Sequence, residues 1–420
     1  MPDTIRLYYG RNSDEMVHRI QEYQSTDSDN PISLLEVRET VLDNVVMEAI
    51  VQLIQSRGVD TIQFDDCGAY ASCFSLQIAQ ALGSVPNVRL TAPTFLSHYF
   101  LDTMLESATK LTNLRIQDHF DCQQMEALAK GLKGNTTLQV LDLSRSRMES
   151  LAILAEGLQE NKTLKVLKLR SLGFNDESIH VLIDAIKYHP QLEDLDLSFN
   201  HCGSLDSLAE LVNDPSCRLS KLSLGYQNLW QSSRIDITAF ARALRRNKRI
   251  TTISLARNKL VDSDILLLAT ALACNNTVQV LDLRENMLSD EGVAILANTI
   301  QHGTGIRNIN LAQNPFQEIG ALSLLKAVET NHKLVDVHVN ETTYKCSEIR
   351  YQTALNKAGR QLLFQSPPLG LWPVVLERIN RLQFSDKQTF IVSSGDTFTR
   401  VDVMHFMVWS SPFLQHVLSV

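Results

Sequence analysis

The chain has 420 residues and a formal net charge of −8, from 39 Lys and Arg against 47 Asp and Glu. Most of the negative excess lies between Met1 and Asp60, so the remainder is close to neutral and a general attraction to nucleic acid or to an anionic membrane is not indicated. The seven cysteines include no CxxC pair, which argues against a zinc site or a disulfide framework and favours a reducing compartment. No segment has the roughly 18 uncharged apolar residues of a membrane span, and no secretory signal pattern opens the chain. We therefore expect a cytoplasmic protein that needs no cofactor.

The first segment, residues 1–31, contains a short strand pattern, TIRLYYG, followed by a helix pattern, DEMVHRIQEYQ, and the polar stretch STDSDNP. A stack of repeated units exposes apolar surface at its ends unless a terminal unit covers it. We expect residues 1–31 to form an acidic N-terminal cap.

Residues 32–344 repeat the pattern LxxLxLxxNxL at a nearly constant spacing. Clear copies are LEDLDLSFNHC from Leu192, ITTISLARNKL from Ile250, VQVLDLRENML from Val278 and IRNINLAQNPF from Ile306. The alternating LxL predicts a short strand, and the apolar residues that follow at i, i+3, i+4 and i+7 predict an amphipathic helix. One unit cannot bury both its strand face and its helix stripe alone, so the units must stack.

These residues resemble the leucine-rich repeat family, and specifically its ribonuclease-inhibitor-like class of about 28-residue strand–helix units. The resemblance implies an α/β solenoid, a horseshoe with a concave parallel sheet, convex helices and a helical C-terminal cap. It also implies a protein that binds other proteins.

Two rows of asparagine recur in the units. Asparagine at the ninth pattern position is expected to turn inward and bond backbone groups that leave the strand; these residues are Asn200, Asn258, Asn286 and Asn314. A second asparagine follows each helix and is expected to adopt the left-handed backbone of a helix C-terminus; these residues are Asn135, Asn161, Asn247, Asn275 and Asn331. This structural role also accounts for the Asn-x-Ser/Thr matches at three of them.

The eighth pattern position is expected to face the concave side, and two adjacent aromatic residues followed by an arginine occupy it in successive units: Phe199, Tyr226 and Arg257. Arg284, at position seven, lies nearby. The unit from Leu219 to Arg249 is longer than the others, and its extra residues are expected in a raised loop where strand passes to helix, carrying Trp230 and Arg234. Tyr, Trp and Arg are enriched in binding hot spots. The alternative is that Trp230 folds back over the core.

No known catalytic, nucleotide-binding or metal-binding motif occurs in the chain. Carboxylates recur on the predicted concave side, but exposed strand positions are commonly polar and a wet, open surface is a poor setting for shifting a pKa; they are Asp142, Asp194, Asp196, Asp282 and Asp336. The basic run RALRRNKR, Arg242 to Arg249, is interpreted as a solvated helix face, with an acidic partner or nucleic acid as alternatives. We expect no enzymatic activity.

After Tyr344 the repeat stops. Residues 345–420 are expected to form a helix, CSEIRYQTALNKAGRQLLF, a break at SPPLGLWP, a second helix, VVLERINRLQ, and a third, strongly apolar element, RVDVMHFMVWSSPFLQHVLSV. We expect a helical C-terminal cap, or alternatively a small partner-binding module.

The sequence as a whole predicts a non-catalytic scaffold that binds a protein partner on the concave face and its rim. The main alternative is a regulator of a small GTPase, because the Ran GTPase-activating proteins share this repeat class, although their acidic tail has no counterpart here. A ubiquitin-ligase recognition arm is a further alternative, without an F-box before the repeats.

Overall fold

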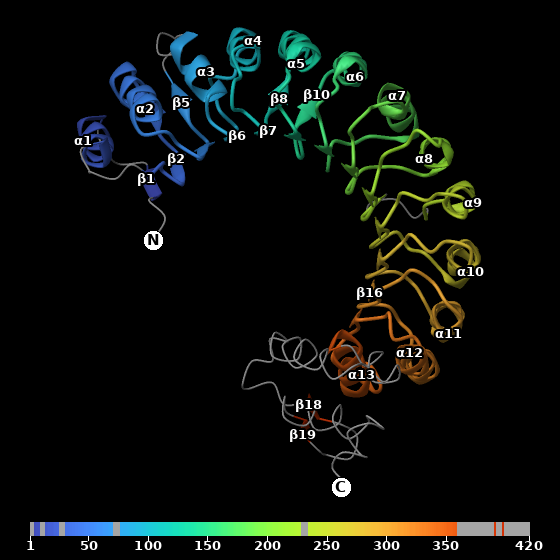
Figure 1. Cartoon of the computed structure of the whole chain (residues 1–420). Coiled ribbons are helices and arrows are strands. Elements are labelled where there is room, and N and C mark those ends of the chain that lie inside the picture. Colours follow the sequence, from blue (N-terminus) through green and yellow to red (C-terminus); the bar gives the residue numbers. More distant parts are fainter. Residues whose placement is uncertain are drawn as a thin grey trace, which may run out of the picture. The chain divides into compact units, whose positions relative to one another are not determined.

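The computed structural model describes residues 4–8, 13–24, 30–69, 76–227, 234–358, 390–391 and 397–398. They divide into two compact units: unit 1 comprises residues 1–202 and 216–220, and unit 2 comprises residues 203–215 and 221–420. In each unit strands and helices alternate along the chain, and the helices cover one side of the strands (Figure 1). We call the opposite, helix-free side the strand side.

Unit 1 contains eight parallel strands among its described residues: β1 (Thr4–Tyr8), β2 (Leu34–Arg38), β4 (Thr61–Asp65), β6 (Asn87–Thr91), β7 (Asn113–Gln117), β9 (Val140–Asp142), β11 (Val166–Lys168) and β12 (Asp194–Asp196). Short parallel pairs follow some of them: β3 (Val41–Leu42) with β5 (Gly68–Ala69), and β8 (His119–Phe120) with β10 (Arg147–Met148). Its helices are α1 (Ser13–Gln24), α2 (Asn44–Ser56), α3 (Leu76–Gly83), α4 (His98–Glu106), α5 (Cys122–Gly134), α6 (Leu151–Glu160) and α7 (Asp176–Ile186).

Unit 2 continues the same alternation with five parallel strands in its described residues: β13 (Lys221–Ser223), β14 (Thr252–Ser254), β15 (Val280–Asp282), β16 (Asn308–Asn310) and β17 (Asp336–His338). Its helices are α8 (Asp206–Asn213), α9 (Thr238–Leu244), α10 (Asp262–Leu272), α11 (Asp290–Gln301), α12 (Glu318–Thr330) and α13 (Cys346–Ala358). The strands β18 (Phe390–Ile391) and β19 (Thr397–Phe398) form an antiparallel pair.

The core of each unit lies between the strands and the helices. In unit 1 one fully buried apolar residue per strand stacks in register on the next: Leu35, Ile62, Val88, Leu114, Leu141, Leu167 and Leu195. The predicted helix stripes are buried as well, for example Ile179, Leu182, Ile183 and Ile186 of α7, and Val293, Leu296, Ala297 and Ile300 of α11. The predicted α/β repeat solenoid is therefore confirmed, and apolar burial at roughly 1.5–3 kcal/mol per large side chain is its main stabilising contribution.

The ninth-position asparagines form the predicted buried ladder. Asn286 Nδ2 donates to the carbonyl oxygens of Leu255 (3.0 Å) and Leu283 (2.8 Å), and its Oδ1 accepts from the backbone N–H groups of Asn258 (2.9 Å) and Leu260 (3.1 Å). Asn200 and Asn314 make equivalent bonds. Each asparagine thus satisfies backbone groups of two successive turns that have no strand partner.

The second row of asparagines corrects an expectation. None of these residues has a positive φ; Asn135, Asn161 and Asn331 follow their helices in extended backbone, with ψ of 132°, 143° and 92°. These asparagines act through side-chain hydrogen bonds instead. Asn161 Nδ2 donates to Leu132 O (2.7 Å) in the preceding strand–helix repeat, and Asn161 Oδ1 accepts from Leu164 N (2.9 Å). The buried side-chain amides of Asn135, Asn161 and Asn275 thus bond one strand–helix repeat to the preceding one. They are therefore unsuited to glycosylation in the folded protein.

At both ends of the chain the described residues continue the strand–helix alternation. Strand β1 pairs with β2, and helix α1 buries Met16 and Ile20, at the places where the sequence predicts a strand and a helix. After β17, helix α13 begins at Cys346, and its Asn356 donates to Val328 O in α12, as the helix-end asparagines of the earlier repeats do in theirs. The later elements expected within 345–420 lie outside the described residues.

Candidate functional site

The strand-to-helix turn at the eighth pattern position has a left-handed backbone in most units. Ten non-glycine residues there have φ between 45° and 64°: Glu39, Asp66, Ala92, Arg145, Ser171, Phe199, Tyr226, Arg257, Glu285 and Gln313. This conformation lets the N–H group of Tyr226 donate to Ala256 O (2.7 Å) and that of Arg257 donate to Arg284 O (2.9 Å), so that pairing between units continues past the strand ends. A left-handed L-residue costs roughly 1–2 kcal/mol, and glycine would avoid that cost.

In unit 2 the turn residues form one cluster around an aromatic ring, which we call the Tyr226 cluster: Tyr226, Arg257, Arg284 and Glu285. The guanidinium carbon of Arg257 lies 5.5 Å from the centre of the Tyr226 ring, and that of Arg284 lies 5.9 Å from it. The Tyr226 hydroxyl donates to Glu285 Oε1 (2.9 Å), and Glu285 Oε2 lies 3.5 Å from Arg257 Nε. The structure therefore brings together three of the predicted site residues.

The surroundings of the Tyr226 phenol keep it neutral, and both guanidinium groups of the cluster are partly exposed to solvent. Burial, and secondly the hydrogen bond to Glu285, raise the pKa of Tyr226 above its ordinary value of 10. The side chains of Arg257 and Arg284 remain 53% and 45% exposed, so each keeps donors free to approach a partner. A ring with its cations already placed loses little rotamer freedom on association.

The remaining predicted residues lie elsewhere. Arg234 Nη1 lies 3.6 Å from Asp264 Oδ2, beside the start of α10, rather than on the Tyr226 ring. Phe199 belongs to unit 1, where Arg170 stacks over its ring at 5.1 Å. Trp230 lies outside the described residues, and with it the choice between a raised position and one over the core.

Two participants were not among the predicted site residues, Glu285 and Arg170. Arg170 stands at pattern position seven and Glu285 at position eight, and both positions face the strand side. Their location in repeats close to those of Phe199 and Tyr226 is the signal that could have identified them. The separation of 59 residues between Tyr226 and Glu285 hides that pairing from any local pattern.

The lengthened unit is longer only on its entry to the helix. Fourteen residues separate the end of β13 from the start of α9, against seven between β14 and α10, between β15 and α11, and between β16 and α12. From the end of the helix to the next strand the lengthened unit has the same spacing as the unit that follows it, with seven residues after α9 and seven after α10. The insertion therefore lies where the sequence predicts it, and a shortened α9 of 7 residues adds to the loop.

The strand-side carboxylates have structural partners. Asp142, Asp196 and Asp282 each accept the backbone N–H two residues further on, at 3.0, 3.0 and 3.2 Å. The same three lie 3.5–3.7 Å from an arginine Nε, of Arg115, Arg170 and Arg284 respectively. These carboxylates stabilise the turns and neutralise neighbouring arginines.

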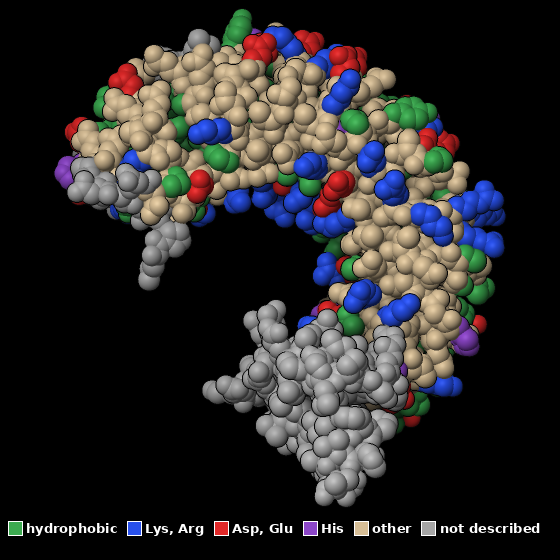
Figure 2. All heavy atoms as spheres, viewed as in Figure 1, with side chains coloured by type: hydrophobic (Ala, Val, Ile, Leu, Met, Phe, Trp, Pro, Cys, Tyr) green, Lys and Arg blue, Asp and Glu red, His purple; other side chains and the backbone are tan. Residues whose placement is uncertain are grey.

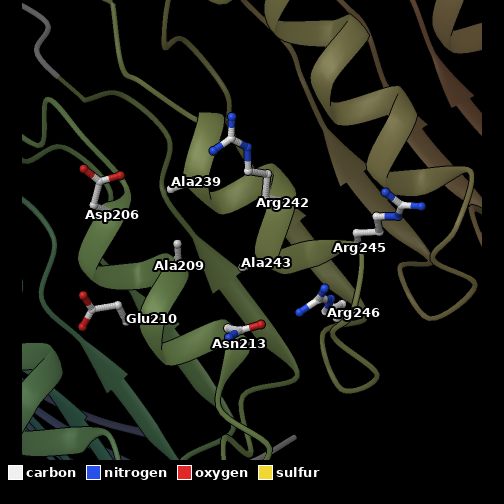
Figure 3. Close-up of a pocket in the computed structure, with 9 residues that line it drawn as sticks. All are labelled: Asp206, Ala209, Glu210, Asn213, Ala239, Arg242, Ala243, Arg245 and Arg246. Carbon is white, nitrogen blue, oxygen red and sulfur yellow. The ribbon is translucent and has the colours of Figure 1, made fainter.

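The basic run that ends α9 lines a groove on the helix side of unit 2. The groove, of about 850 Å³, lies between α8 and α9, with Asp206 and Glu210 on one wall and Arg242, Arg245 and Arg246 on the other (Figure 3). The carboxylates of α8 point away from the arginines, and all three arginines are exposed, as predicted for a solvated face. Figure 2 shows basic side chains gathered on the outer side at this place.

The described ranges hold neither a cluster of metal ligands nor a membrane-spanning helix. In that part of the chain no group of three or more His, Cys, Asp or Glu side chains could hold a metal ion. No helix in it is long and apolar enough to cross a membrane.

Comparisons with known proteins were made by sequence and by structure. A family model described as "Leucine Rich repeat" matches residues 274–297. Among solved structures, one titled "Leiomodin-1 Actin-Binding Site 2 (ABS2)" is similar at 17% identity and a TM-score of 0.31, over 38% of this chain and 95% of that chain. A search of the curated proteins finds no match.

The family-model match covers most of α11 and the strand β15 that precedes it. The remaining units repeat the same strand, left-handed turn and helix, with the asparagine ladder between them. These units therefore form an α/β repeat solenoid with leucine-rich-repeat motifs.

Proposed function

We propose that this protein is a non-catalytic scaffold of the ribonuclease-inhibitor-like class that binds a protein partner through the Tyr226 cluster. The observation that carries the proposal is the arrangement of two arginines over one tyrosine ring whose hydroxyl is already bonded to Glu285. Such a cluster offers an aromatic surface, partly exposed cations and little ordering cost on binding.

The bulky residue at this turn also supports a binding role. Glycine suits the left-handed backbone at Tyr226 better than tyrosine does, so the conformation of the turn does not require the tyrosine side chain. Arg234 and the inserted loop with Trp230 would extend the contact surface within unit 2. The pair of Phe199 and Arg170 would be a second contact on unit 1.

The terminal segments have proposed roles of their own. Residues 1–31 would act as the N-terminal cap, since Ile5, Leu7, Met16 and Ile20 are buried against the first full unit. Residues 345–420 would act as the C-terminal cap, with α13 as its first helix.

The test is quantitative affinity capture with mass spectrometry, using the wild-type protein, Tyr226→Ala and Arg257→Ala. Loss of a hot-spot side chain costs about 2 kcal/mol or more, so we expect recovery of the specific partner to fall by more than about tenfold. Tyr188→Ala is the matched control, because Tyr188 is an exposed tyrosine at the end of α7 with a lysine over its ring. Unchanged recovery with both cluster variants would refute the proposal.

A GTP-hydrolysis assay with a panel of small GTPases separates the scaffold from the GTPase regulator. The scaffold predicts no stimulation of hydrolysis by the purified protein.

A further inference from the structure

A second surface lies on the strand side of unit 1, where cationic side chains outnumber the carboxylates among them. Arg89 on β6 and Arg115 on β7 are partners in the strand register, so their backbones lie about 4.8 Å apart. Asp142 follows in register on β9 and Lys168 on β11. Figure 2 shows Lys and Arg side chains gathered along this side of the sheet.

The ion pairing of this row is incomplete. Arg115 Nε lies 3.7 Å from Asp142 Oδ2, while the other oxygen of Asp142 accepts the N–H of Ser144. Within the described residues no carboxylate lies within ion-pair distance of Arg89 or Lys168. Like charges directly across neighbouring strands destabilise a sheet by roughly 0.2–1 kcal/mol, so the pair of Arg89 and Arg115 does not serve the fold.

The same residues line a depression in the surface. Its volume is about 280 Å³, and its polar lining consists of Asn87, Arg89, Asn113, Arg115, Asp142 and Lys168. The two asparagines are held in place by a bond from Asn113 to Asn87 and by one from Asn87 to the backbone of Asp60 (2.9 Å). The depression therefore presents three cationic side chains and one carboxylate beside two asparagine amides that hydrogen bonds hold in place.

We infer that this depression binds an acidic segment of a polypeptide, with one carboxylate between Arg89 and Arg115 and another on Lys168. Lys168 lies about two and a half strand spacings, or about 12 Å, from the midpoint of Arg89 and Arg115. This span is close to that of two residues four apart, which lie on the same face of an extended chain at about 3.3 Å per residue. The site is independent of the Tyr226 cluster, which belongs to unit 2.

The distribution of charge favours a polypeptide over a nucleic acid. Asp142 interrupts the cationic row, and Asp196 ends it, each at the same pattern position as the cations. A nucleic-acid backbone with a charge at every phosphate would meet both carboxylates, whereas a peptide can place its acidic residues only opposite the cations.

The test measures fluorescence anisotropy of a labelled short polyglutamate peptide with the full chain at low and at physiological salt. We expect binding that weakens with salt, and no binding of a polyglutamine peptide of the same length. Arg89→Gln and Arg115→Gln should each weaken binding about tenfold, while Lys110→Gln, an exposed lysine of unit 1 just before β7, should leave it unchanged.

Thermal unfolding of the same variants separates binding from structure. Arg89→Gln should melt at the wild-type temperature or slightly above it, because it removes like-charge repulsion. Equal affinity of Arg89→Gln, Arg115→Gln and the wild-type protein for polyglutamate would overturn the proposal. So would the absence of polyglutamate binding at low salt, or tighter binding of oligothymidylate than of polyglutamate.

Discussion

At the scale of single residues, the left-handed turn at Tyr226 separates the demands of the fold from those of the surface. Tyr226 has φ of 62° and its N–H group is bonded to Ala256, so the backbone conformation is held by the neighbouring unit rather than by the side chain. The Tyr226 side chain contacts Arg257, Arg284 and Glu285, and these contacts lie on the strand side.

We predict that Tyr226→Gly is more stable than Tyr226→Ala, although both remove the same ring. Glycine avoids the left-handed cost of roughly 1–2 kcal/mol but loses roughly 0.5–1 kcal/mol through its freer unfolded chain, so the difference in free energy of unfolding should be about 0.5–1 kcal/mol. Urea denaturation of the two variants measures it. A less stable glycine variant would show that the turn is not under backbone strain.

A second residue-scale prediction concerns His189, which takes the place of the helix-end asparagine in its unit. Its Nδ1 accepts the N–H groups of Gln191 (3.3 Å) and Leu192 (3.1 Å), a role that requires the neutral ring, and burial lowers the pKa of His189. The unfolded chain takes up a proton near the ordinary pKa of 6.5, so the free energy of unfolding should fall as the pH drops below about 6.5 towards the lower folded pKa.

Replacement of His189 by the asparagine of the neighbouring units should remove this loss. We expect His189→Asn to fold and to show a smaller decrease in melting temperature between about pH 7 and pH 5 than the wild-type protein. His180→Asn, on the exposed face of α7, is the control and should keep the wild-type pH dependence. Identical pH dependence in His189→Asn and the wild-type protein would rule out this role.

At the scale of elements, the helices of unit 1 pack closely where glycine removes a side chain. A Cβ at Gly157 of α6 would lie 2.6 Å from Ala129 Cα of α5, whereas a Cβ at Gly134, the last residue of α5, would meet no atom within 4 Å. The spacing of these helices is therefore set by backbone approach as well as by the apolar stripes.

We predict opposite effects of alanine at these two glycines. Gly157→Ala should lower the free energy of unfolding by about 1–3 kcal/mol through overpacking, and Gly134→Ala should leave it unchanged or raise it by up to about 1 kcal/mol through helix propensity. Thermal melts of the two variants provide the comparison. Equal melting temperatures would mean that α6 can move away from α5 without loss.

At the scale of the whole molecule, stability depends on stacking, because each strand–helix unit buries its apolar face only against its neighbours. The first strand and helix place Ile5, Leu7, Met16 and Ile20 in the core, each fully buried or nearly so. Their removal would leave β2 as an open sheet edge and uncover the adjoining face of α2.

We predict that deletion of residues 1–29 destabilises unit 1 by several kcal/mol, at roughly 1.5–3 kcal/mol for each large apolar side chain that the core no longer holds. Lower melting temperature and increased binding of a hydrophobic dye are the measurements. Asp14→Asn, an exposed change in α1, should stay within about 0.5 kcal/mol of wild type. A deletion with wild-type stability would argue against the capping role.

The amino-acid sequence by itself determined the alternation of strand and helix, the buried stripes, the inward asparagines and the place of the long loop. All of these depend on side-chain periodicity within a single strand–helix unit. Only the tertiary structure decided that the helix-end asparagines are extended, that position eight is left-handed, and that Tyr226 bonds Glu285 and Arg115 lies beside Arg89. These features depend on hydrogen bonds and side-chain contacts between stacked strand–helix units. The register of the neighbouring backbones decides which atoms meet.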